Sequence, residues 1–156
     1  MAKATPATRA LEAAHVSFTM HEYDYDPDAA RIGLQAADAL GVSPERLLKT
    51  LMARAGGEIV CVLVPSDREV NLKKLAAVAG AKSAAMCKPA EAERVTGYRV
   101  GGISPFGQKK RVRAVIERSA LAHEKVIVNG GRRGLQIELS AADLLRVLSA
   151  VTADLT

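Results

Sequence analysis

The residue types that support metal or redox chemistry are scattered along this sequence. His15, His21 and His123 form no His-x-x-x-His motif and lie near no cluster of acids, so a metal site would need ligands from distant positions. Cys61 and Cys87 form no Cys-x-x-Cys motif, which argues against a zinc knuckle or a redox dithiol. We therefore expect neither a metal ion nor another cofactor.

A protein nucleophile is equally hard to assign. Ser104 is the obvious candidate, but its surroundings lack the second glycine of the hydrolase nucleophile elbow, so a turn is favoured. Cys61 lies in an apolar run, where a thiol usually packs rather than reacts. Near Cys87 no residue supplies a base. Spacing thus supports no Ser-His or Cys-His pair.

Two glycine-rich loops carry more information. In the first, the N–H groups of Gly101 and Gly102 could receive a phosphate or a developing oxyanion. In the second, Gly130 and Gly131 precede two arginines. The basic residues that follow or belong to these loops are Lys109, Lys110, Arg111, Arg132 and Arg133. Either loop alone is equally well explained as a turn with a solvated charged run, but their recurrence favours contacts with phosphates, such as those of polyphosphate or tRNA.

Lys49 is a cation in an apolar setting, between Leu47-Leu48 and Leu51-Met52. Burying an unpaired lysine is costly, so the position indicates a partner. A lysine that extends its stem from a strand edge into water would explain the pattern as well.

The composition favours a polyanionic partner. The chain of 156 residues has 22 Lys and Arg against 17 Asp and Glu, giving a net charge of +5. Aromatic residues make up only 3%, so a platform that stacks successive bases is hard to build. The sequence shows no apolar segment typical of a signal peptide or a membrane span, and with no disulfide framework we expect a cytoplasmic protein.

The periodicity of apolar residues and the positions of helix-capping residues predict the helices and strands that position these residues. Apolar spacing predicts helices over 5–14, 34–40, 71–79, 89–95 and 140–148, with a short helical segment opening at 43–45. Strands are predicted over 16–21, 51–53, 58–64, 112–116, 125–128 and 135–139, with a tight hairpin at Gly56-Gly57 between the second and the third. Gly41 and Gly80 are expected to end the helices that they follow. We expect one α+β domain over 1–156, with a mixed, largely antiparallel sheet curled into a partly open barrel and surrounded by helices.

Four segments together resemble the YbaK/EbsC family of bacterial Cys-tRNA(Pro) deacylases, relatives of the editing domain of prolyl-tRNA synthetases. The segments are 48–51 (Leu-Lys-Thr-Leu), 67–75, 96–110 (from Thr-Gly-Tyr-Arg to Gln-Lys-Lys) and 130–135. The resemblance covers nearly the whole chain. It implies a mixed-strand barrel and hydrolysis of Cys mischarged onto tRNA(Pro), with no metal.

The resemblance also implies roles for individual residues. Lys49 matches a lysine expected to hold the terminal adenosine phosphate or the ester carbonyl, and Gly101 and Gly102 match the loop whose N–H groups surround the ester. The expected substrate-binding residues are Tyr23, Thr50, Ser104, Asn129 and Gln136. Some family members carry Ser at position 129 and Asp at position 136.

The family further implies that the substrate's own thiol attacks its ester and releases a cyclic thiolactone. Two alternatives remain: a deacylase of another mischarged tRNA such as Ala-tRNA(Pro), and a noncatalytic module that binds the tRNA end or a synthetase. The expected partners are the aminoacyl-tRNA 3′ end and prolyl-tRNA synthetase, with no membrane.

Overall fold

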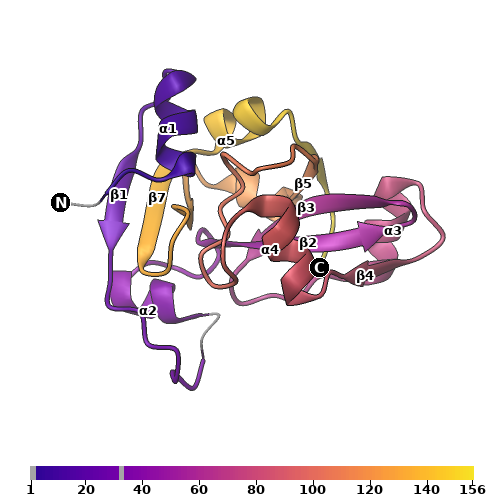
Figure 1. Cartoon of the computed structure of the whole chain (residues 1–156), viewed down its shortest axis with the longest axis horizontal. Helices are drawn as coiled ribbons and strands as arrows, with labels where there is room; N and C mark the ends of the chain where they lie inside the picture. Colours follow the sequence, from indigo (N-terminus) through magenta and orange to yellow (C-terminus); the bar gives the residue numbers. More distant parts are fainter. Residues whose placement is uncertain (1–2, 32–33) are drawn as a thin grey trace.

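The described strands form two sheets that meet near the middle of the molecule (Figure 1). The structure is a computed structural model that describes residues 3–31 and 34–156. The smaller sheet has the order β1-β7-β6 and the larger has the order β4-β2-β3-β5-β8. The smaller sheet consists of β1 (Thr19–Glu22), β6 (Lys125–Asn129) and β7 (Leu135–Ser140). The larger consists of β2 (Leu48–Ala55), β3 (Glu58–Pro65), β4 (Ala84–Met86), β5 (Arg113–Glu117) and β8 (Val151–Ala153).

The helices begin and end at residues that suit helix termini. They are α1 (Pro6–Ala13), α2 (Gln35–Leu40), α3 (Leu72–Ala79), α4 (Pro89–Thr96) and α5 (Ala141–Leu148), with a 3-10 helix η2 (Arg118–Ala122). Thr5, Asn71 and Ser140 accept backbone N–H groups at the starts of α1, α3 and α5. Because these side chains satisfy donors that the first helical turn leaves unpaired, they fix where each helix starts.

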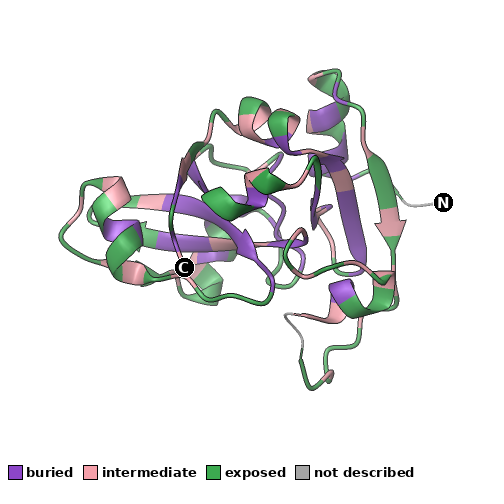
Figure 2. Ribbon diagram, turned by 180° about the vertical axis from the view of Figure 1, so that it is seen from behind, coloured by how far each residue is buried: buried purple, intermediate pink, exposed green. Residues whose placement is uncertain are grey.

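Three apolar clusters hold the layers together. The largest lies under α1, α4 and α5 and includes Leu48, Met52 and Phe106. A second packs α3 against the other face of the larger sheet. A small third cluster joins α2 to Leu47 and Ile127, where β2 approaches β6. Figure 2 shows the result, with buried residues along the central strands and exposed residues on the outer faces of the helices.

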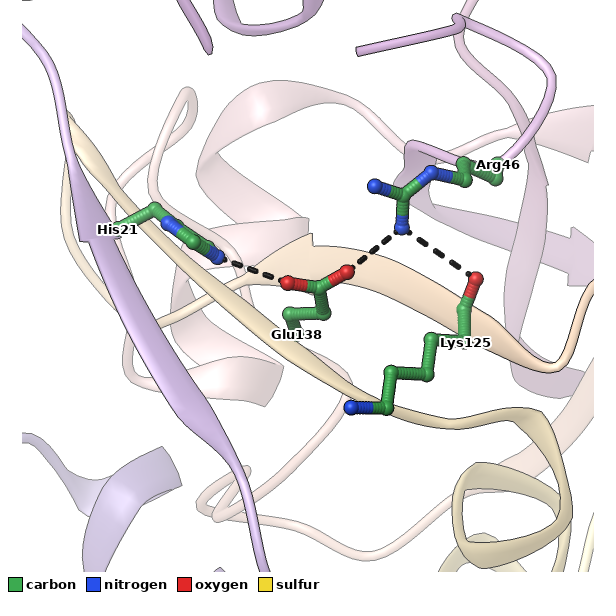
Figure 3. Close-up of polar contacts among 4 residues, drawn as sticks. All are labelled: His21, Arg46, Lys125 and Glu138. Carbon is green, nitrogen blue, oxygen red and sulfur yellow. Dashed lines mark hydrogen bonds and ion pairs between the residues drawn. The ribbon is translucent and has the colours of Figure 1, made fainter.

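A polar network fixes the smaller sheet to the segment that leads into β2 (Figure 3). Glu138 accepts from His21 Nε2 at 2.9 Å and from Arg46 Nη1 at 2.7 Å. The Arg46 guanidinium, and then the His21 ring, hold the pKa of the Glu138 carboxyl below its usual range. Since Arg46 immediately precedes the Leu47–Ile127 bridge, the network sets how the two sheets meet.

Most predicted elements are confirmed, including the hairpin at Gly56-Gly57 and the helix end at Gly41, which has φ +67°. The helical segment predicted at 43–45 is wrong: it forms a turn in which Arg46 N–H donates to Ser43 O. The first strand begins at Thr19 rather than at residue 16.

The architecture is mixed α+β, as predicted, and the described strands form two sheets that do not close into a barrel. Two short strands, β4 and β8, were missed, as were the parallel pairings of β5 with β3 and with β8. Among residues 3–31 and 34–156, no helix combines the length and apolar character needed to cross a membrane.

Candidate functional site

A cavity of about 380 Å³ opens where the two sheets meet. Its wall is mostly apolar, and a few polar groups converge on it, the arrangement typical of small-ligand sites. The apolar lining residues are Ala36, Leu47, Leu48, Leu51, Met52, Met86, Pro89, Ala92, Val100 and Ile103. The remaining lining residues are Tyr23, Tyr25, Lys49, Thr50, Cys87, Gly101, Asn129 and Gln136. We call this cavity the junction pocket.

The free edge of β2 forms one side of the junction pocket. Strand β4 pairs with β2 only at Ala53–Ala55, so it stops short of the part of β2 that lines the cavity. Met52 C=O faces this edge, because it accepts from Cys87 N–H at 3.0 Å. The two-residue period of a strand then places the backbone N–H and C=O of Thr50 at the same edge, next to the pocket.

Lys49 lies at the rim of the junction pocket. Its side chain is 21% exposed, and Nζ lies 3.3 Å from Oε1 of Glu69. Glu69 is itself 92% exposed, so this contact is weak and easily replaced. The lysine stem is therefore packed while its charge stays free to meet an anionic or carbonyl oxygen of a ligand.

The two glycine-rich loops meet at the pocket. Asn129 Nδ2 donates to Gly101 O at 3.2 Å, and Asn129 Oδ1 accepts from Gly131 N–H at 2.7 Å. Arg133 Nε donates to Val100 O at 3.1 Å. Gly101 has φ +91°, a conformation that an L side chain adopts only with strain. These contacts fix the position of the Gly101 backbone in the pocket wall.

Two buried polar atoms in the pocket wall have no partner among the described residues. They are Thr50 Oγ1 and Gln136 Oε1. A buried polar atom without a hydrogen bond is costly, so both positions suit a ligand that brings polar groups. Burial raises the pKa of the neighbouring Tyr23 hydroxyl, an effect only partly offset by the Gln136 side chain. Tyr23 is therefore a neutral hydrogen-bond donor at neutral pH.

Cys87 is the one thiol in the pocket wall among the described residues. Burial, followed by the Glu91 carboxylate, raises the pKa of this thiol to about 11. At neutral pH about one molecule in ten thousand then carries the thiolate. Cys87 is a poor nucleophile in this setting. Within residues 3–31 and 34–156, no cluster of three or more His, Cys, Asp or Glu residues could hold a metal ion.

Comparisons with known proteins find relatives over most of the chain. The model of the family "Aminoacyl-tRNA editing domain" matches residues 26–147. The chain is 33% identical, over 97% of its length and 93% of the relative's, to the Enterococcus faecalis protein described as "Putative Cys-tRNA(Pro)/Cys-tRNA(Cys) deacylase EbsC". It is 35% identical over 62% of its length to 16% of a proline–tRNA ligase from Geobacillus thermodenitrificans. A solved structure described as "a putative trans-editing enzyme for prolyl tRNA synthetase" superposes with a TM-score of 0.82 at 24% identity, covering 99% of both chains.

The chain belongs to the aminoacyl-tRNA editing domain family. This confirms the resemblance found in the sequence. Most of the residues expected to form the site of this editing domain lie in the wall of the junction pocket. Lys49, Gly101, Tyr23, Thr50, Asn129 and Gln136 all line it.

Gly102 and Ser104 do not line the junction pocket. Gly102 N–H donates to Arg99 O at 2.8 Å, so it is already paired and is no free oxyanion donor in this structure. Ser104 is fully buried, and its Oγ accepts from Phe106 N–H at 3.2 Å. Both residues shape the loop that carries Gly101 and Ile103.

The basic residues expected to contact phosphates fall into two groups. Arg132 and Arg133 lie beside the junction pocket, where Arg132 pairs with Glu22 at 3.4 Å and Arg133 lies 5.2 Å from the centre of the Tyr25 ring. Lys109, Lys110 and Arg111 instead lie along a separate groove. The first group supports the pocket loops, while the second is exposed to solvent.

Sequence reasoning missed most of the apolar wall of the site. Tyr25, Met86 and Val100 come from three segments that no motif connects. Tyr25 carried a weak signal, since it follows Tyr23 by two residues and so lies on the same side of an extended chain. Met86 and Val100 are exposed large apolar residues, at 43% and 40%, a property that cannot be read from the sequence.

Proposed function

We propose that this editing domain deacylates tRNA(Pro) mischarged with cysteine. The observation that carries the proposal is the junction pocket, whose apolar wall, unpaired polar atoms and single lysine suit a small aminoacyl ester at the end of a nucleic acid. The relative described as a Cys-tRNA(Pro)/Cys-tRNA(Cys) deacylase supports this substrate class.

Each polar group of the pocket has a role in the proposal. Lys49 at the rim holds the terminal adenosine phosphate or the ester carbonyl. Gly101 N–H, together with the backbone of Thr50 at the free edge of β2, faces the carbonyl as negative charge develops. Such preorganised donors are commonly the largest single source of rate enhancement. Tyr23, Asn129 and Gln136 bind and orient the aminoacyl group.

The attacking group in this proposal belongs to the substrate. No histidine or carboxylate is among the described residues that line the pocket, and the Cys87 thiol has its pKa raised to about 11. The cysteinyl thiol of the substrate, with an ordinary pKa of about 8.5, is more readily ionised.

The proposed reaction is an intramolecular ester cleavage. The substrate sulfur attacks its own carbonyl carbon, the new C–S bond forms and the ester C–O bond breaks. The terminal ribose hydroxyl leaves with the proton that the thiol lost, and a cyclic thiolactone is released. The pocket accelerates the step by holding the ester in a reactive geometry.

The test is a panel of separately prepared Cys-tRNA(Pro), Ala-tRNA(Pro) and Pro-tRNA(Pro). We expect deacylation of the cysteinyl substrate well above the spontaneous rate and little change in the other two. Faster deacylation of Ala-tRNA(Pro) would identify another deacylase of the same fold. Absence of turnover on all three, with tRNA binding retained, would support the noncatalytic alternative. Repeating the panel with prolyl-tRNA synthetase added tests whether the synthetase supplies the substrate.

A further inference from the structure

A second cavity, of about 670 Å³, is lined by the C-terminal half of α4, whereas the junction pocket is lined by its N-terminal half. The wall of the second cavity is dominated by cations, which the proposed chemistry does not use. They are Arg54, Arg94, Lys109, Lys110, Arg111 and Arg113. We call this cavity the basic groove.

The positive charge of the basic groove is only partly neutralised by the protein. Arg113 pairs with Glu58 at 3.0 Å, and Glu91 accepts from Arg54 and lies 3.8 Å from Arg94. Two carboxylates thus form ion pairs with three of the six cations. The run 109–111 forms no ion pair with any described residue and is exposed.

Hydrogen bonds fix the backbone of the two lysines in run 109–111. Lys109 N–H donates to Thr96 O at 2.9 Å, and Lys110 N–H donates to Val95 O at 3.0 Å. These are carbonyls of the last turn of α4, where the helix dipole also favours positive charge. The lysines are therefore presented by a fixed scaffold, which lowers the entropic cost of binding an anion.

Two elements connect the basic groove to the junction pocket. The first turn of α4 lines the pocket with Pro89 and Ala92, and its last turns line the groove with Arg94 and Val95. Strand β2 runs from the pocket at Lys49–Met52 to Arg54 in the groove. The five residue-to-residue steps of strand from Lys49 to Arg54 span about 16 Å. At about 3.4 Å per stacked nucleotide, that distance matches the short unpaired 3′ end of a tRNA.

We propose that the basic groove binds the RNA backbone of the substrate where the acceptor duplex begins, while the 3′ end runs along β2 and α4 into the junction pocket. This inference rests on the proposed function and adds a second, sequence-independent contact. Phosphate contacts supply affinity and register without reading bases. In this proposal the groove binds the RNA backbone, and the pocket positions the ester.

The first test measures binding of uncharged tRNA as a function of salt concentration. The double variant Lys109→Gln/Lys110→Gln should bind about tenfold more weakly at low salt, with the slope of log K against log salt reduced by about 1 to 2, because each lost phosphate contact releases fewer counterions. The matched control is Lys82→Gln/Lys125→Gln, which removes the same charge from exposed positions outside both cavities. Equal effects in the two variants would overturn the proposal.

The second test compares substrates of two lengths. Cys-tRNA(Pro) reaches both cavities, whereas a cysteinylated trinucleotide with the 3′-terminal sequence reaches only the junction pocket. For the groove variant we expect KM to rise about tenfold on tRNA, with kcat within about twofold, and no comparable rise on the trinucleotide. A rise of the same size on both substrates would contradict the proposed path.

The two tests separate this inference from the proposed function. The binding test needs no turnover, so a wild-type protein that binds tRNA through the groove but deacylates nothing would refute the deacylase proposal alone. If the protein deacylates normally and replacing Lys109 and Lys110 leaves its tRNA affinity unchanged, only the proposal that the groove binds tRNA is refuted.

Discussion

The junction pocket and the basic groove are lined by opposite ends of α4 and differ in chemical character. The pocket is mostly apolar, and its buried Thr50 Oγ1 and Gln136 Oε1 have no hydrogen-bond partner among residues 3–31 and 34–156. The groove is exposed and charged, and its basic run at 109–111 forms no ion pair within the described part of the chain. The apolar, low-dielectric wall of the pocket strengthens its few electrostatic contacts, and such contacts stabilise the charge that develops in the chemical step. Solvent-exposed cations suit salt-sensitive attraction of a polyanion.

Lys49 gives the largest expected effect, since it is the cation of the pocket rather than of the groove. Lys49→Ala should lower kcat/KM for Cys-tRNA(Pro) by about 10²-fold, the range expected when one preorganised electrostatic contact is lost. The variant should stay folded, because the Glu69 contact that it loses is exposed, and the loss of the packed lysine stem should lower the melting temperature only modestly. Near-normal activity would show that Lys49 does not contribute to the site. The control is Lys82→Ala.

Neutralising Lys109, Lys110, Arg111, Arg132 and Arg133 together should weaken tRNA binding and flatten its salt dependence. The structure sharpens this prediction, because Arg133 binds Val100 O and stacks on Tyr25. We expect most of the slope change from Lys109→Gln/Lys110→Gln and little from Arg133→Gln. An unchanged slope after replacing all five would mean that these residues only solvate the surface.

Gly102 tests whether the pocket depends on close contact between its two loops. A Cβ at Gly102 would lie 2.8 Å from Arg132 Cα and from Arg133 N. Gly102→Ala should therefore destabilise the fold by about 1–3 kcal/mol, the usual cost of overpacking, and displace Gly101. Urea unfolding measures the effect. The control is Gly57→Ala, since a Cβ at Gly57 meets no atom within 4 Å, and equal losses would contradict the explanation.

Glu138 lies outside both cavities and gives a smaller effect that depends on pH. The Arg46 guanidinium and the His21 ring lower the pKa of its carboxyl in the folded state. The ion network therefore stabilises the fold fully above the unfolded-state pKa of about 4.3, and this stability is lost as the pH falls through the lower, folded-state pKa.

Glu138→Gln should cost about 1 kcal/mol at pH 7, as expected for a partly exposed network of charged hydrogen bonds. The difference between wild type and variant should shrink as the pH falls below about 4. Unfolding free energies measured from pH 3 to pH 7 check this. A difference that is constant with pH would contradict the charge-based explanation.

The sequence predicts the groups that a local pattern defines. Asn71 and Gly80 bracket α3 as expected, and Gly56-Gly57 closes the β2–β3 hairpin. Lys49 and Gly101 were found because a cation in an apolar run and a glycine-rich loop are unusual in themselves. The family resemblance added Tyr23, Asn129 and Gln136, which line the pocket.

The sequence could not predict features that depend on how distant segments meet. Strand β8 is three residues long, and its parallel partner β5 lies more than thirty residues earlier, so no local period marks it. The pairing of Gly102 N–H with Arg99 O depends on the path of the loop. The division of the basic residues also depends on tertiary structure, since run 109–111 lines a different cavity from the junction pocket.

We propose that the reacting nucleophile belongs to the substrate rather than to the protein. This implies that Cys61→Ala and Cys87→Ala stay within about twofold of wild-type activity, because the pKa values of the two thiols are raised to about 12 and about 11 and neither is expected to react. A large loss in the Cys87 variant, with tRNA binding intact, would instead point to a protein thiol.

The most direct measurement compares Cys-tRNA(Pro), Ser-tRNA(Pro) and Cys-tRNA(Pro) alkylated on its thiol, at equal concentration with one protein preparation. A hydroxyl fills nearly the same space as a thiol but is a much poorer nucleophile at neutral pH. We predict similar binding of the seryl substrate with deacylation far slower than that of the cysteinyl substrate, and no deacylation of the alkylated substrate above the spontaneous rate. Cleavage of alkylated or seryl substrate at the cysteinyl rate would contradict the claim and require a water molecule activated by the protein.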